Sequence, residues 1–113
     1  MADDDAVGWV PKTAFVMPVL PPELSVDPVL ASLLHCIAFL ELSGADAVDP
    51  DWAVEVMEHV AHYLQRLTPQ QADEIRRQLV SIAEHGRRHS FPDPLTKFLE
   101  TFLQHCGVPE RRR

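Results

Sequence analysis

The stretch Pro28–Leu42, PVLASLLHCIAFLEL, decides the fold, because it predicts a helix with apolar side chains on nearly every face. Three residues interrupt the apolar run, namely Ser32, His35 and Glu41. Both ends carry helix signals: Asp27 is a favourable N-cap, Pro28 suits the first position, and Ser43-Gly44 is a stop. A helix without a polar side is normally covered by other helices or by a partner. We therefore expect 28–42 to be the central helix of the core.

Three more helices are predicted downstream, at 50–67, 69–85 and 94–106. Two of them begin at an Asp-Pro pair, at 49–50 and 93–94, and the other begins at residues 68–71, TPQQ, which have the form of a capping box. Gly86 and Gly107 are the expected stops of the last two helices. At about 100° per residue, one side of helix 50–67 gathers the side chains expected to be buried: Val56, Met57, Val60, Ala61, Tyr63, Leu64 and Leu67.

Four helices with short connections favour an all-α fold, a four-helix bundle-like array in which residues 27–107 form one domain. The chain has 113 residues, of which 46% are hydrophobic and 24% are charged, as expected for a single globular core. Residues 108–113 are predicted to be a polar, basic tail.

Residues 1–26 are predicted to form an acidic tip followed by an extended, proline-rich arm. Prolines at 11, 18, 21 and 22 prevent a continuous helix there. The arm also carries large apolar side chains, among them Trp9 and Met17, which are unfavourable in water. We therefore expect the arm to pack in a groove of its own helices or of a second copy of the chain.

The net charge of −7 is unevenly distributed along the chain. Residues 1–58 hold eleven acidic side chains and one basic side chain, Lys12, whereas 59–113 hold nine basic and six acidic side chains. The first half therefore repels a phosphate backbone, which argues against nucleic-acid binding, and attracts a basic protein. Acidity that merely maintains solubility would explain the same pattern.

Two cysteines, Cys36 and Cys106, lie seventy positions apart, and this sparse usage is typical of reduced thiols in the cytoplasm. The first five residues, MADDD, lack the basic region of a secretory signal. The apolar stretch 28–42 is shorter than the roughly 20 residues that span a bilayer. A cytoplasmic protein without a membrane segment is expected.

One cluster has the residue types of a metal site: Glu55, Glu58, His59 and His62. Its members fall within about 100° of arc on helix 50–67, and imidazole and carboxylate are ligands for zinc, iron or manganese. The cluster lies opposite the apolar stripe, however, and its spacing matches no established helical metal motif. Pairs of charged side chains on a solvated face explain it better. Two His-Cys pairs, at 35–36 and 105–106, are likewise better explained by small buried cysteines.

A basic group is distributed along helix 69–85 and beyond its end: Arg76, Arg77, Arg87, Arg88 and His89. Such a group can bind a carboxylate or a phosphate. Basic side chains also stabilise the C-terminal end of a helix and pair with acidic neighbours. We favour this structural interpretation.

No nucleophile, phosphate-binding loop or paired-carboxylate cleft can be identified, so neither an enzyme nor a cofactor is expected. The short, acidic, helical chain favours a non-enzymatic interaction module, an inhibitor or antitoxin-like immunity protein that binds a basic partner such as a toxin domain. The expected binding residues are acidic and lie around the connection between the first two helices: Glu41, Asp46, Asp49, Asp51, Glu55 and Glu58. One alternative is a homodimeric regulatory or scaffold protein that uses helix 28–42 and the arm as its interface. The other is a metal-binding helical protein that uses the Glu and His cluster at 55–62.

Overall fold

The computed structural model describes residues 13–110, and within this range the chain forms helices and no strand. A short 3-10 helix precedes four α-helices: η2 (Pro22–Leu24), α1 (Pro28–Leu42), α2 (Pro50–Leu64), α3 (Pro69–Arg88) and α4 (Asp93–His105). The predicted all-α class with four main helices is therefore confirmed. No helix in the described range is both long enough and apolar enough to cross a membrane.

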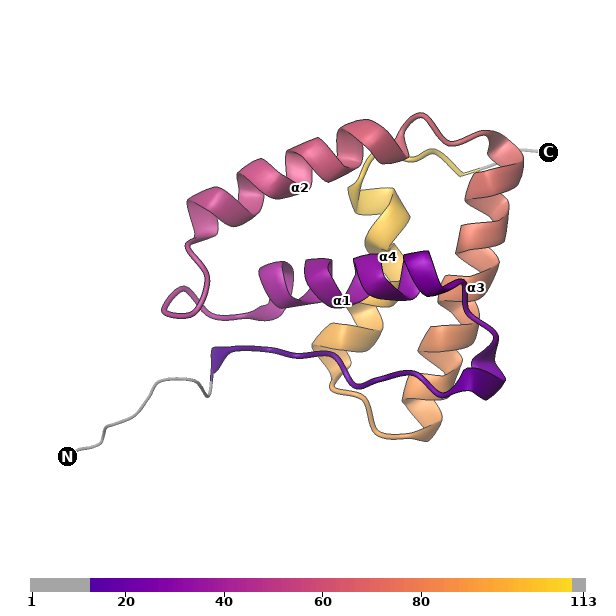
Figure 1. Ribbon diagram of the computed structural model, residues 1–113, viewed down its shortest axis with the longest axis horizontal. Coiled ribbons are helices and arrows are strands. Elements are labelled where there is room, and N and C mark those ends of the chain that lie inside the picture. The colour runs from indigo at the N-terminus through magenta and orange to yellow at the C-terminus, as the bar shows by residue number, and fades with distance from the viewer. Residues whose placement is uncertain (1–12, 111–113) are drawn as a thin grey trace.

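The four α-helices form two antiparallel pairs that cross each other (Figure 1). Helices α1 and α2 make one pair, and α3 and α4 make the other. The closest packing is between α3 and α4, and α1 packs against both α4 and α2. Helix α2 therefore lies at the edge of the array, with α1 as its main neighbour.

The core is built mainly by α1, α3 and α4. Helix α1 contributes one buried face, made by four residues one or two turns apart: Leu30, Leu34, Ile37 and Ala38. These side chains meet Ile82 of α3 and Leu99 of α4, which are fully buried. Helix α1 is central, as predicted, but its cover is incomplete, because Val29 is 75% exposed and Cys36 is also exposed.

The N-terminal caps follow the sequence signals in three of the four helices. The Asp27 carboxylate accepts a hydrogen bond from the Leu30 N–H at 3.0 Å, Asp49 caps α2, and Thr68 forms the predicted capping box. Helix α4 differs, since its N-cap is Pro92 and no side chain caps it. Helix α2 also ends earlier than predicted, at Leu64.

Gly86 does not end α3, as the sequence predicted, because the helix continues to Arg88. The glycine is buried, and a Cβ atom at this position would lie 2.5 Å from Cδ2 of Phe91. The Phe91 N–H also donates to the Gly86 carbonyl at 2.9 Å. Gly86 therefore allows the loop after α3 to fold back closely onto the helix.

Gly107 ends α4, as predicted, in a left-handed conformation with φ of 78°. Its N–H donates to the Gln104 carbonyl and the Val108 N–H donates to the Leu103 carbonyl, both at 3.0 Å, which is the Schellman pattern. Val108 and Leu103 are both buried. The prediction of a polar tail from residue 108 is therefore wrong at its first position, and residues 111–113 lie outside the described range.

The described part of the arm packs on its own domain and runs alongside α1 (Figure 1). The Gly44 N–H donates to the Thr13 carbonyl at 2.8 Å, and the Phe15 N–H donates to Ser43 Oγ at 2.8 Å. Met17 is 1% exposed and belongs to the core. The expectation for Trp9 falls on residues 1–12, which lie outside the described range.

Candidate partner-binding surface

Helix α2 has no buried residue and carries several large exposed apolar side chains. Trp52 is 69% exposed, Tyr63 is 64% exposed and Val56 is 41% exposed. The prediction that Val56 and Tyr63 are buried is therefore wrong. The reason is that α2 packs mainly on α1, which covers only a narrow side of the helix around Met57 and Val60.

The six acidic residues predicted to bind a partner are all exposed. They lie toward one end of the α1–α2 pair: at the end of α1, in the connecting loop and in α2 as far as its middle (Figure 1). No lysine or arginine occurs in residues 13–58. We call this region the acidic end. Within residues 13–58, therefore, no lysine or arginine offsets its negative charge.

Local contacts hold parts of the acidic end in place. Asp46 accepts a hydrogen bond from the Thr13 hydroxyl, and Asp49 accepts one from the Asp51 N–H at 2.9 Å. Glu55 lies 3.2 Å from His59 Nε2 on the exposed face of α2. The acidic end is therefore ordered by the arm and by helix capping while its carboxylates stay accessible.

Trp52 was not among the residues predicted from the sequence, although it lies within the acidic end. It occupies the first turn of α2, next to Asp51 and one turn before Glu55. The sequence did indicate that Trp52 is exposed, because it lies outside the apolar stripe that was expected to pack against the core. An exposed indole within one helical turn of two acidic residues suits contact with an arginine or lysine side chain.

The candidate metal cluster on α2 does not form a site in the structure. Glu55, Glu58, His59 and His62 are all exposed, and His62 contacts Arg66 at 3.0 Å. Among residues 13–110, no three His, Cys, Asp or Glu side chains gather closely enough to hold a metal ion.

The two cysteines lie in different environments. Cys106 is buried, as predicted, but Cys36 is exposed, so the expectation that both thiols are buried is wrong for Cys36. Burial raises the pKa of the Cys106 thiol, and the carboxylate of Glu41 raises it further.

We expect a thiol reagent to label Cys36 rapidly in the native protein and Cys106 only after unfolding. Cys36 is exposed, whereas Cys106 is buried and its raised pKa disfavours the thiolate, which is the reactive form. Mass spectrometry of protein labelled for a short time, with and without denaturant, measures this directly. Rapid native labelling at Cys106 would contradict the packing around the end of α4.

The basic group is largely engaged in contacts within the protein. Arg76 pairs with Asp73 at 3.1 Å and donates to the Pro109 carbonyl at 2.8 Å. Arg77 pairs with Glu74, and Arg87 pairs with Glu100 of α4. These contacts agree with the structural interpretation of the arginines.

At the end of α3, the imidazole rings of His85 and His89 stack on each other, with their centroids 4.1 Å apart. Burial lowers the pKa of His85, and the neighbouring His89 and Arg88 lower it further. The neutral form of His85 is therefore favoured where the loop after α3 packs on the helix.

No protein-family model, curated protein or solved structure matches the chain.

Proposed function

We propose that this chain is a non-enzymatic protein-binding module, an acidic inhibitor or immunity-type protein that covers a basic partner such as a toxin domain in the cytoplasm. The observation that carries the proposal is the exposed Trp52 in the first turn of α2, within the acidic end. Six carboxylates and an indole on one surface offer charge for attraction and an aromatic side chain for anchoring.

Electrostatics favours a basic partner because the acidic end is a concentrated negative region. Such a region raises the association rate of an oppositely charged protein and loses this effect as salt increases. Tryptophan is among the residues that most often dominate the energy of an interface. Trp52 can stack against an arginine of the partner while Asp51 or Glu55 pairs with its guanidinium group.

Charge reversal at the acidic end tests the proposal. The partner is captured from an extract of the native host, purified, and its affinity is measured for wild type and for Glu55→Lys/Glu58→Lys. We expect a basic partner and an affinity about tenfold lower for the double variant at low salt. Glu84→Lys/Glu110→Lys is the matched control, since it makes the same charge change at two exposed residues outside the acidic end.

Trp52→Ala belongs to the same experiment and removes the aromatic anchor without touching a charge. Tyr63→Ala is its control, because Tyr63 is similarly exposed but lies at the other end of α2. We expect Trp52→Ala to weaken binding and Tyr63→Ala to have little effect. An acidic partner, or equal losses in the charge-reversed variant and its control, would contradict the proposal.

A homodimer is the second candidate, and a specific observation favours it. The arm exposes Val16 and Val19, at 75% and 88%, and the first turn of α1 exposes Val29 at 75%. These are the elements that the sequence predicted for a dimer interface. Sedimentation equilibrium over a wide range of protein concentration tests this, and a monomer throughout would exclude it.

A further inference from the structure

A groove of about 590 Å³ opens between the start of α1, the end of α2 and the first half of α3. Apolar side chains form its floor: Val29, Leu33, Leu64, Leu67, Ile75 and Phe102. The groove exists because α2 packs on α1 and is not in close contact with α3. The start of α1 and the end of α2, which line the groove, lie at the opposite end of the α1–α2 pair from the connecting loop (Figure 1).

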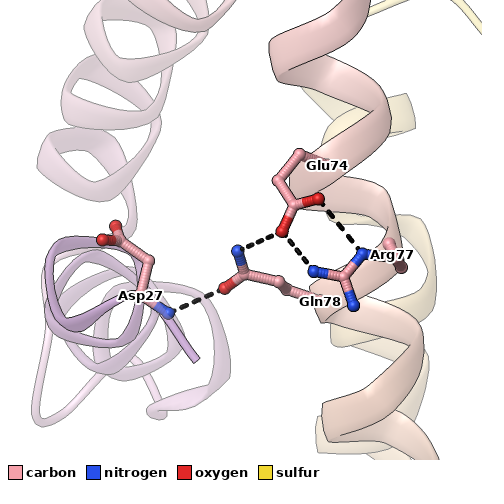
Figure 2. A network of polar contacts seen from close by, with 4 residues as sticks. All are labelled: Asp27, Glu74, Arg77 and Gln78. Carbon is pink, nitrogen blue, oxygen red and sulfur yellow. Dashed lines mark hydrogen bonds and ion pairs between the residues drawn. The ribbon is translucent and has the colours of Figure 1, made fainter. Parts of the chain in front are cut away.

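The rim of the groove is fixed by a polar network that joins α1 to α3 (Figure 2). The Asp27 N–H donates to Gln78 Oε1 at 2.8 Å, and Gln78 Nε2 donates to Glu74 Oε2 at 2.9 Å. Arg77 Nε donates to Glu74 Oε1 at 3.1 Å. The network therefore fixes the start of α1 against α3, which reduces the cost of ordering this rim on binding.

The charge of the groove favours a cationic ligand. Its lining contains two acidic residues, Asp27 and Glu74, and no basic residue. Hydrogen bonds from Arg77, and secondarily from Gln78, lower the pKa of Glu74, so this carboxylate stays ionised. Arg77 neutralises Glu74 in part, but Asp27 uses only one carboxylate oxygen, Oδ2, to cap α1. The other oxygen of Asp27 can accept a hydrogen bond from a ligand.

The length of the groove suits a short helix. Its α3 wall extends from Gln70 to Gln78, which is about 12 Å at 1.5 Å per residue. About eight residues of a ligand helix, a little over two turns, cover this length and place apolar side chains at i, i+3, i+4 and i+7 on the floor. The polar rim then faces the ligand's hydrophilic side.

We propose that this groove binds a basic amphipathic helix of a partner protein. Apolar side chains of that helix lie on the floor beside Val29 and Leu33, and a lysine or arginine contacts Asp27. This site is separate from the acidic end and does not rest on the function proposed above, so either proposal can fail alone.

A labelled peptide tests the proposal with the full chain. The probe is an amphipathic peptide of about 14 residues with leucine on one helical face and lysine on the other. A scrambled peptide of the same composition is the first control. The test variant is Val29→Lys, and Val80→Lys is its matched control, because Val80 is also exposed, at 53%, but lies outside the groove.

We expect the amphipathic peptide to bind wild type and to gain helicity by circular dichroism. Val29→Lys should weaken binding at least about tenfold, while Val80→Lys should stay within about twofold of wild type. If a thermal melt shows that Val29→Lys is unfolded, Glu74→Gln replaces it, with Glu84→Gln as control. The same order of affinities is then expected.

Three results would overturn the proposal. The first is the absence of peptide binding, and the second is equal binding of the scrambled peptide or equal binding by the groove variant and its control. The third is a dimer in sedimentation equilibrium that dissociates in Val29→Lys and excludes the peptide, which would show that a second copy fills the groove.

Discussion

Met17→Ala is expected to lower the free energy of unfolding by about 3 kcal/mol, which lies within the range for large apolar residues truncated in a core. Met17 is 1% exposed and is the one fully buried side chain of the described arm. Its loss removes apolar contacts and leaves a cavity that the arm cannot close, because backbone hydrogen bonds at Thr13 and Phe15 fix the arm nearby.

Urea denaturation followed by circular dichroism measures the effect of Met17→Ala. Val19→Ala is the matched control, since Val19 lies two residues away in the same arm but is 88% exposed. Its unfolding free energy should change by less than about 0.5 kcal/mol. Equal effects of the two substitutions would show that the arm is not anchored on the core in solution.

Gly86→Val should lower the free energy of unfolding by about 2–3 kcal/mol, as overpacking of a tight contact does. In an unobstructed helix the same change would be slightly favourable, because valine has a higher helix propensity than glycine. Glycine is about 1 kcal/mol less favourable than alanine in a helix, and valine lies between the two. The contact with Phe91 makes the change in stability unfavourable instead, since the new side chain would clash with the phenyl ring.

A double-mutant cycle separates these two effects at Gly86. In a Phe91→Ala background the ring is removed and only the Cβ of residue 91 remains close, at 3.1 Å, so Gly86→Val should cost less than about 1 kcal/mol. Chemical denaturation of the four proteins gives the coupling free energy between the two positions. A coupling near zero would mean that the loop after α3 does not pack on Gly86.

The local signals of the sequence predicted the helices well because capping is a short-range interaction. Asp27 and Ser43-Gly44 gave the bounds of α1 correctly, and Thr68 forms the expected capping box. Gly107 ends α4 through hydrogen bonds to its own last turn. Each of these features depends on residues within a few positions of the helix end.

Errors arose where contacts between distant residues decide the structure. In the sequence Gly86 resembles a helix stop, but in the structure it is the residue on which Phe91 packs. The stripe that includes Val56 and Tyr63 has the period of a buried face, but periodicity does not reveal how much of that face a neighbour covers. Helix α2 has one main neighbour, so two members of the stripe remain exposed.

The acidic end could be located from the sequence because the connection between the first two helices brings its residues together. The position of Trp52 outside the apolar stripe indicated that it is not buried in the core, but the extent of its exposure depends on where α2 lies. The groove was equally hidden, because residues as distant as Val29 and Phe102 line it together. Only the crossing of the two helix pairs makes them neighbours.

The absence of buried side chains in α2 affects how the protein adapts to other molecules. Displacing α2 would break only partly buried contacts, such as those of Met57 and Val60, and would leave the buried core of α1, α3 and α4 in contact, so its free-energy cost is lower than that of global unfolding. One tether opposes such movement at its C-terminal end, where Gln65 Nε2 donates to the Cys106 carbonyl at 2.8 Å. We therefore expect the N-terminal end of α2 to exchange its backbone amides faster than its C-terminal end and than α1, α3 and α4.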